Sequence, residues 1–231
     1  MIARVWRWTK WAIAGLLLLF LLYQLWILGH LFWWKSHAPA STSFMSIRLA
    51  ELREKNPRAS LQYQWVPYAR ISDSLKRAVV AAEDDGFVDH DGFDWEGIQR
   101  ALEKNQKRGK VVAGGSTISQ QLAKNLFLSP AKSWLRKGEE VLITFMIESV
   151  LDKQRILEIY LNVVEWGNGL FGAEAAARRY YGLSAAQLGP DQAAHLAVML
   201  PNPRKYEKQF GPRLQAHAER ILGRMRYAEI P

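Results

Sequence analysis

An acidic cluster interrupts an otherwise basic chain, and it is the first place where chemistry is expected. Between Glu83 and Glu96 there are seven acidic residues and no Lys or Arg, although Lys and Arg outnumber Asp and Glu by 31 to 22 over the 231 residues. Crowded carboxylates repel one another, so we expect at least one of them to have a raised pKa. A carboxyl group that titrates near neutrality suits general base or acid catalysis. The alternative is a solvated acidic turn.

Glu83 has a further peculiarity, which is its expected place in a helix. Ser72 can cap a helix whose apolar residues recur at helical spacing up to Ala82, and Gly86 is a natural stop. Glu83 then lies in the last turn, where the helix dipole disfavours an anion. A carboxylate in such an unfavourable place is a hint of function. The cluster lacks the residue order of a calcium-binding loop.

A second motif runs from Gly114 to Asn125, where two glycines lead into an expected helix. Thr117 and Gln120 can form a capping box, and backbone N–H groups at such a helix start bind anions. Thr117, Gln121 and Lys124 follow one another at helical spacing and therefore share one face. This polar face, which ends in a cation, suits sugar hydroxyls and a phosphate. An ordinary capped helix is the alternative.

A third segment adds a second carboxylate, on a helix expected from Arg136 to Leu151. Arg136 and Glu140 are four residues apart, so they can form an intrahelical ion pair, which contributes only tenths of a kcal/mol when exposed. The functional interpretation places Glu140 in the same site as Glu83. The preceding residues, 126–135, are apolar with interspersed Lys and Trp, which suits either the membrane interface or the core. Around Gly109, four basic residues predict a mobile loop: Lys104, Lys107, Arg108 and Lys110.

The N-terminal region predicts a membrane anchor. Residues 11–34 are 24 residues without Lys, Arg, Asp or Glu, and at about 1.5 Å per residue such a helix crosses a bilayer. Three basic residues precede it and place the N-terminus in the cytoplasm: Arg4, Arg7 and Lys10. A cleaved signal peptide is the alternative, because residues 38–40 read Ala-Pro-Ala, but the run is longer than the roughly 7–15 apolar residues of such peptides.

The chain accordingly divides into a cytoplasmic tail (1–10), a transmembrane helix (11–34), a small-residue polar linker (35–46) and one domain (47–231). Cysteine is absent, which excludes disulfides, thiol nucleophiles and cysteine metal sites. The net charge of +9 fits an anionic membrane surface, a phosphorylated substrate or nucleic acid. Because the basic domain would lie across a membrane from DNA, we expect no nucleic-acid partner.

Four ordered motifs resemble those of the peptidoglycan glycosyltransferases (glycosyltransferase family 51), and more narrowly their monofunctional, penicillin-insensitive members. They are Glu-Asp-x-x-Phe-x-x-His-x-Gly at 83–92, Gly-Gly-Ser-Thr-Ile-Ser-Gln-Gln-Leu-x-Lys-Asn at 114–125, Arg-Lys-x-x-Glu at 136–140 and Ile-Leu-Glu-x-Tyr-Leu-Asn at 156–162. A mild departure is Tyr181, where the family has Phe. The resemblance covers about residues 60–205.

The resemblance implies a mainly α fold, with a lysozyme-like helical head and a smaller membrane-associated jaw. It implies polymerisation of lipid II into β-1,4-linked glycan strands, with inversion at the donor carbon and release of undecaprenyl pyrophosphate. Glu83 would be the base, and Glu140 would act through a divalent cation, Mg²⁺, or by orienting cations; no organic cofactor is implied. The remaining implied substrate-binding residues are Asp84, Phe87, His90, Ser116, Thr117, Gln120, Gln121, Lys124, Asn125, Arg136 and Lys137.

The implied partners are lipid II, the growing glycan strand, the lipid bilayer and other proteins of cell-wall synthesis or division. The implied location is the bacterial inner membrane, with a single span and the catalytic domain on the periplasmic face. Two other classes of function compete. A lysozyme-like or lytic enzyme would use Glu83 as an acid but has no need of Lys124, Arg136 and Lys137, and a non-catalytic scaffold would not need the paired glutamates.

Overall fold

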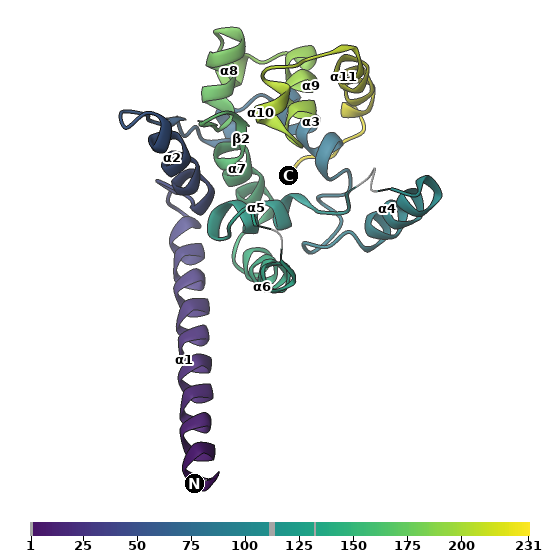
Figure 1. Ribbon diagram of the computed structural model, residues 1–231. Coiled ribbons are helices and arrows are strands. Elements are labelled where there is room, and N and C mark those ends of the chain that lie inside the picture. The colour runs from purple at the N-terminus through teal and green to yellow at the C-terminus, as the bar shows by residue number, and fades with distance from the viewer. Residues whose placement is uncertain (1, 111–113, 132) are drawn as a thin grey trace.

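The structure is a computed structural model that describes residues 2–110, 114–131 and 133–231, without the side chains of residues 2–5 and 7. The side chains of Arg4 and Arg7, on which the expected orientation depends, therefore lie outside the described part. The predicted class is confirmed: the fold is mainly α and has one N-terminal helix that is long and apolar enough to cross a membrane. Figure 1 shows this helix, α1, projecting from a domain that holds all the other elements.

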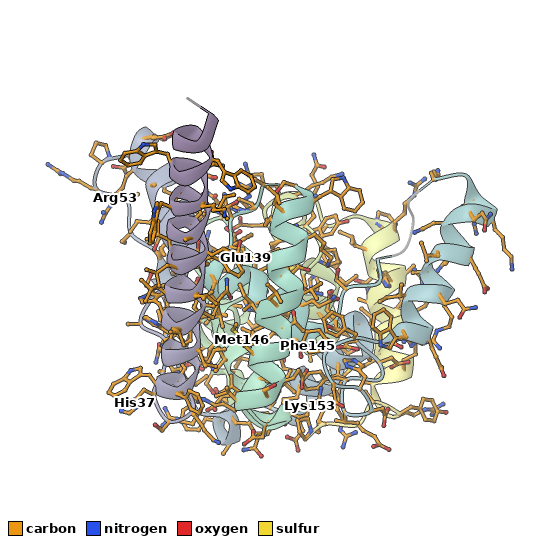
Figure 2. All side chains as sticks on the ribbon, turned by 90° about the horizontal axis from the view of Figure 1, so that it is seen from below. His37, Arg53, Glu139, Phe145, Met146 and Lys153 are labelled. Atoms are coloured by element: carbon orange, nitrogen blue, oxygen red, sulfur yellow. The ribbon has the colours of Figure 1, made fainter. Side chains whose placement is uncertain are left out.

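The helix α1 runs from Ile2 to Trp34, which is about 50 Å of helix, and its residues 8–34 have a mean hydropathy of 2.2. Its C-terminal end is fixed to the domain. Arg155 donates from Nε to the carbonyl of Trp34 at 2.8 Å and from Nη2 to that of His37 at 2.6 Å. Figure 2 shows the same end lying beside α6. The anchor and the domain are thus joined by packing and hydrogen bonds as well as by the chain.

Ten further α-helices are described: α2 (Ser43–Lys55), α3 (Asp73–Glu83), α4 (Trp95–Arg108), α5 (Ile118–Phe127), α6 (Trp134–Val150), α7 (Lys153–Val163), α8 (Ala173–Tyr181), α9 (Pro190–Met199), α10 (Pro203–Tyr206) and α11 (Pro212–Met225). Single 3-10 turns lie at Tyr68–Arg70 and Ala185–Gln187. The start of α2 lies inside the stretch expected to be linker, because Thr42 caps it by accepting a hydrogen bond from the Met45 backbone.

A small sheet holds three strands in the order β1 (Gln62–Tyr63), β3 (Leu170–Phe171), β2 (Glu165–Gly167). β1 pairs with β3 in parallel and β2 with β3 antiparallel, with Gln62 opposite Leu170. Arg48 of α2 fixes this edge by a buried ion pair, at 2.7 Å, with Glu165. The sheet therefore attaches α2 to the domain.

Two groups of helices meet where the acidic cluster lies. α3 packs against α9 and α11, and α5 packs against α6 and α7. The core between them is continuous and includes Leu75 of α3, Leu122 of α5 and Ile147 of α6, all fully buried. This packing brings the C-terminal end of α3 next to α5.

The basic segment around Gly109 differs from the prediction. It is not a loop up to that point, because α4 continues to Arg108 and ends on Gly109, whose φ is +63°. A left-handed glycine is a common helix C-cap. The apolar residues of α4 do recur at helical spacing, at Trp95, Ile98, Ala101 and Leu102, so the sequence carried a signal for this helix that the run of basic residues after them obscured. In both views α4 lies on the opposite side of the domain from α1 (Figures 1 and 2).

The apolar segment 126–135 divides between its two expected environments. Leu126 and Leu128 are buried in the core, whereas Trp134 and Leu135 at the start of α6 are exposed. Lys132, in the middle of this segment, lies outside the described residues. The exposed apolar face continues along α6 through Leu142 to Phe145, which is labelled in Figure 2.

Candidate active site

Glu83 is the last residue of α3, as the sequence predicted, and it borders a cavity of about 120 Å³ that Asp94, Ser116 and Arg224 also line. The helix does not end on a left-handed glycine. Its C-cap is Asp84, which is extended with φ −164° and ψ 77°, because its carboxylate is held by contacts outside the helix. The amide nitrogen of Gln121, on α5, donates to Oε2 of Glu83 at 2.7 Å.

The environment of Glu83 raises its pKa, as expected for one member of the cluster. The largest cause is burial, while repulsion from Asp84 is the smallest. The hydrogen bond from Gln121 and the positive charge of Lys124 favour the ionised form but do not cancel the effect of burial. Removal from water therefore matters more than the crowding of acids from which the shift was predicted.

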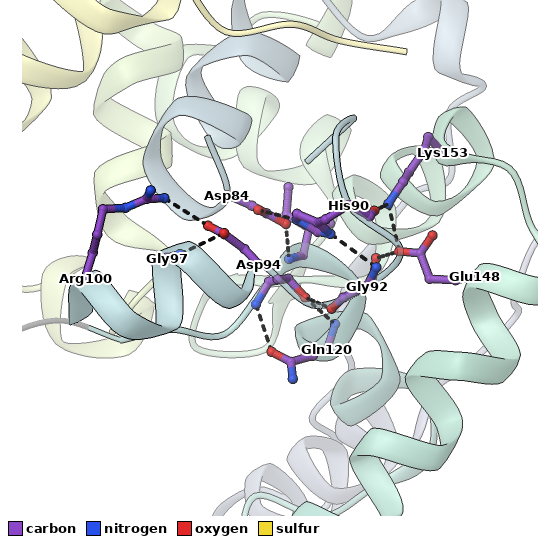
Figure 3. Close-up of polar contacts among 12 residues, drawn as sticks. Asp84, His90, Gly92, Asp94, Gly97, Arg100, Gln120, Glu148 and Lys153 are labelled. Carbon is purple, nitrogen blue, oxygen red and sulfur yellow. Dashed lines mark hydrogen bonds and ion pairs between the residues drawn. The ribbon is translucent and has the colours of Figure 1, made fainter. Parts of the chain in front are cut away.

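Asp84 joins the acidic motif to the start of α5. Its Oδ2 accepts from the backbone N–H of Ile118 at 2.9 Å, and its Oδ1 lies 2.9 Å from Nε2 of His90. An anion at a helix N-terminus is favourable because unpaired N–H groups point at it. The pKa of His90 is lowered by burial but raised by a larger total effect of Asp84, and the net shift is upward. Asp84 therefore positions the loop that follows Glu83 (Figure 3).

The other end of this loop is fixed by Gly92 and Thr117. The backbone N–H of Gly92 donates to Nδ1 of His90 at 3.2 Å, and the hydroxyl of Thr117 donates to the carbonyl of Gly92 at 2.7 Å. Gly92 has φ +88°, and a Cβ atom there would come within 2.8 Å of Thr144. Glycine is therefore required both by the backbone conformation and by the space.

The capping box predicted at the start of α5 is present. Thr117 accepts from the backbone N–H of Gln120 at 3.2 Å, and the Gln120 side chain accepts from the backbone N–H of Thr117 at 3.1 Å. Both residues are buried, and their side-chain oxygens are used in this way. Their contribution is to fix the helix that carries Gln121 and Lys124.

Lys124 lies between the two predicted carboxylates. Burial lowers its pKa and is the largest cause; Glu140 and Glu83 act to raise it, while Arg136 and Lys137 act to lower it. Lys124 lies on α5, which packs against α6, so its charge acts on Glu83 and on the ionic residues near the start of α6. The structure thus brings the second and third motifs together around Lys124.

Glu140, although only 3% exposed, is paired with two cations of its own helix. Arg136 donates from Nη1 to Oε2 at 2.7 Å, and Lys137 donates to Oε1. Nε of Arg136 is buried and has no hydrogen-bond partner within the described chain. This donor is therefore not satisfied by the described residues.

The Mg²⁺ expected from the resemblance has no fitting donor set at Glu140. Each of its oxygens accepts from a cation, and the described residues contain no group of three His, Cys, Asp or Glu side chains that could hold a metal. A hard cation such as Mg²⁺ needs several oxygen ligands. The metal requirement stays a prediction, which activity with and without a chelator tests, and no step below depends on it.

The other predicted site residues occupy different surroundings. Phe87 is fully buried and lies under the ammonium group of Lys153, 4.7 Å from its ring centroid, and Asn125 is also buried. Ser116 is exposed at the cavity beside Glu83. Phe87 and Asn125 are therefore placed to support the site, and direct substrate contact by any of these three stays a prediction.

A second polar cluster, for which the sequence predicts no role, lies behind the loop. Glu148 of α6 accepts from Ser119 and, at 2.9 Å, from Lys153, which also donates to the carbonyl of His90 (Figure 3). Glu148 continues the four-residue spacing of Arg136, Glu140 and Thr144, and that spacing was the available signal. Tyr160 of α7 was also left without a role, although its hydroxyl donates to Gln121 at 2.9 Å.

Comparison with known proteins adds to this geometry. The sequence model of the Transglycosylase family matches residues 50–226. A biosynthetic peptidoglycan transglycosylase of Azoarcus sp. (strain BH72) is 66% identical over 227 residues, which is 98% of each chain. Proteins of the same name from Aromatoleum aromaticum and Dechloromonas aromatica are 68% and 62% identical, over 94% and 97% of this chain and 94% and 98% of their own.

Proposed function

This chain belongs to the transglycosylase family and is a peptidoglycan glycosyltransferase, and from that premise we propose how its site lengthens glycan strands. The proposed substrate is lipid II, a disaccharide carried on undecaprenyl pyrophosphate. A hydroxyl oxygen of the acceptor sugar displaces the pyrophosphate from the donor sugar. The protein has to remove a proton from the attacking hydroxyl and stabilise the charge on the departing pyrophosphate.

Glu83 is the proposed base. It takes the proton from the 4-hydroxyl of the acceptor's N-acetylglucosamine as that oxygen attacks C1 of the donor's N-acetylmuramic acid. The α-linked donor then gives a β-1,4 bond, so the configuration inverts. A base is effective when its pKa approaches the working pH, and burial raises the pKa of Glu83 in that direction.

The proposed leaving-group site comprises Lys124, Arg136 and Lys137. Charge-assisted hydrogen bonds to phosphate are strong, particularly where water is excluded. Arg136 and Lys137 are held by Glu140, and Nε of Arg136 is a buried donor without a partner among the described residues. The single observation that carries the proposal is the place of Lys124, which interacts electrostatically with both Glu83 and the Arg136–Lys137–Glu140 group. It connects the proposed base to the proposed leaving-group site.

We propose that the N-terminal helix holds this site at a membrane surface. We propose that α1 spans the bacterial inner membrane, with the N-terminus in the cytoplasm and residues 47–231 outside. Partner proteins of cell-wall synthesis and division belong to the same proposal. Protease added to spheroplasts should digest the domain, whereas a mature protein that starts near Ser41 would show a cleaved signal peptide instead.

The decisive experiment is polymerisation of labelled lipid II by Glu83→Gln, with product strands resolved by length. A general base contributes about 10²- to 10⁴-fold, so turnover should fall by that factor while folding and donor binding persist. Glu96→Gln is the matched control, because it is the same change at an exposed glutamate of the same cluster and should keep wild-type turnover. Near-normal turnover in Glu83→Gln would refute the assignment of the base.

A further inference from the structure

A chain of two hydrogen bonds leads from the proposed base into the core. The hydroxyl of Tyr160 donates to Oε1 of Gln121 at 2.9 Å, and Nε2 of the same amide donates to Oε2 of Glu83 at 2.7 Å. Three helices contribute one residue each, since Glu83 ends α3, Gln121 lies on α5 and Tyr160 on α7. The residues at the two ends are 77 positions apart in the sequence.

The two faces of a glutamine amide have opposite character. Its nitrogen donates two hydrogen bonds, and its oxygen only accepts. An ionised carboxylate accepts only, so it is stabilised by the nitrogen and opposed by the oxygen. Without another constraint, a half turn of the Gln121 amide would place the wrong atom against Glu83.

Tyr160 provides that constraint. It is fully buried on α7, where Asn162 joins the helix to Val66 by two hydrogen bonds of 2.9 Å. The pKa of Tyr160 is raised well above 10.0, chiefly by burial, so its hydroxyl keeps its proton. A phenol proton in a fixed place requires an acceptor, and the oxygen of Gln121 meets it.

We propose that Tyr160 is a positioning residue for catalysis, whose hydroxyl fixes the Gln121 amide so that its nitrogen faces Glu83. The inference rests on the proposed role of Glu83 as the base. The positioned amide affects the ionisation of Glu83, because a hydrogen bond donated to a carboxylate favours its charged form. Without the Tyr160 hydroxyl, the amide can turn and accept a hydrogen bond from the protonated carboxyl group of Glu83, so Glu83 then binds its proton more tightly.

Other ionisable groups near Glu83 remain the same in the variant. They are Asp84 beside it, Lys124 on α5, and Asp85, Asp94 and Arg224 around the adjoining cavity. His90 titrates against Asp84 on the far side of the loop. Because these groups are common to both proteins, the difference between two pH profiles reports the Gln121–Glu83 contact.

The test is the pH profile of kcat/KM for lipid II in the full-length enzyme with Tyr160→Phe, which retains the ring and removes only the hydroxyl. A base must be unprotonated to act, so activity falls on the acid side of its pKa. The acid limb should move to higher pH by about one unit, while the alkaline limb should stay where it is in the wild type. Tyr180→Phe is the matched control, because the Tyr180 hydroxyl donates to the Trp166 carbonyl and to no residue of the Gln121–Glu83 chain, and the acid limb of this variant should not move.

Gln121→Met supplies the second arm. It removes both hydrogen bonds and should also move the acid limb upward, and adding Tyr160→Phe should then have no further effect, because the hydroxyl acts through Gln121. An unmoved limb in Tyr160→Phe, a loss that is equal at all pH values, or additive shifts in the double variant would each overturn the inference. If Glu83→Gln is inactive while the acid limb of Tyr160→Phe is unmoved, only the positioning role of Tyr160 fails. If Glu83→Gln is active, the proposed base fails with it.

Discussion

Glu83 and Glu140 are the two glutamates of the site, and the protein surrounds them in opposite ways. Glu140 is buried against two cations, Arg136 and Lys137, four and three residues earlier on its own helix. Glu83 ends its helix, where the dipole opposes an anion, and its nearest hydrogen-bond donor is the neutral amide of Gln121. Lys124 is the cation whose charge favours the ionised form of Glu83.

This difference separates the proposed roles of two residues with the same side chain. A carboxylate matched by two cations is a fixed negative charge, suited to holding those cations in place. A partly buried carboxylate with one amide donor binds a proton more readily, which suits it to act as a base. Environment, rather than residue type, sets acid and base roles in such pairs. The predictions below test this separation.

The largest effect is expected at Lys124, which acts on both glutamates. Lys124→Ala should lower kcat by about 10²- to 10³-fold, as for other lost groups that stabilise developing charge, and weaken donor binding much less. The measurements are steady-state kinetics on lipid II and, separately, binding of a pyrophosphate-bearing donor analogue. Lys107→Ala, a change at an exposed lysine of α4, serves as the control. Unchanged kcat with lower affinity would mean that Lys124 only recruits substrate.

Deprotonation of Lys124 is also expected to set the alkaline limb of the pH profile. Burial lowers its pKa from 10.5, so its charge, and the activity that needs it, should be lost as the pH rises through that lowered value. Lys124→Arg keeps the charge because the pKa of arginine exceeds about 12. The alkaline limb of this variant should therefore lie at higher pH, even where its maximal kcat is reduced. Identical alkaline limbs would assign that ionisation to another group.

The next effect concerns Glu140. In Glu140→Gln, two cations lose their partner, and removal of one member of a buried pair is costly. Because Lys137 is 40% exposed and Arg136 18%, we expect a decrease of only about 1–3 kcal/mol in the free energy of unfolding, with about a tenfold lower kcat. Glu83→Gln should lose more activity without this loss of stability. Equal stability of the two variants in denaturant titrations would contradict the proposed contrast.

A smaller effect is expected for Arg136→Lys. The guanidinium group can bond to Glu140 from Nη1 while Nε remains available, whereas an ammonium group is a single point of charge. Arg136→Lys keeps the charge, so its kcat should fall by only about three- to tenfold. The kcat of Arg136→Ala should fall further. Full activity of the lysine variant would show that charge suffices and that the fork is not used.

The local parts of the site could be predicted from the sequence. The helix that ends at Glu83 and the capping box of Thr117 and Gln120 follow from rules that act over three or four residues. The pair of Arg136 and Glu140 follows from helical spacing alone. Each of these motifs depends only on residues a few positions apart, so the sequence alone is sufficient to predict it.

The contacts that give the site its chemistry span much longer distances along the chain. Asp84 meets Ile118 across 34 positions, and Tyr160 meets Gln121 across 39. Both depend on how α3, α5 and α7 pack, and side-chain periodicity does not determine that packing. The sequence predicted the raised pKa from repulsion among the acidic residues, which is the smallest of its causes. The largest cause, burial, could not be inferred from the acidic cluster.

The smallest expected effect, which tests the environment of Glu83 most directly, is a difference in stability between wild type and Glu83→Gln that changes with pH. The pKa of Glu83 is raised above 4.5 in the folded protein, so between the two values the folded state binds more protons than the unfolded state. Stability then falls with rising pH in that interval and levels off above the folded pKa.

Glutamine cannot ionise, so the free energy of unfolding of Glu83→Gln should lack this decrease. The variant should gain on wild type as the pH rises from about 4.5, and the contributions of His90 and the other acids cancel in the difference. Parallel curves would show that folding costs the ionised Glu83 nothing, and its distinction from Glu140 would then rest on activity alone.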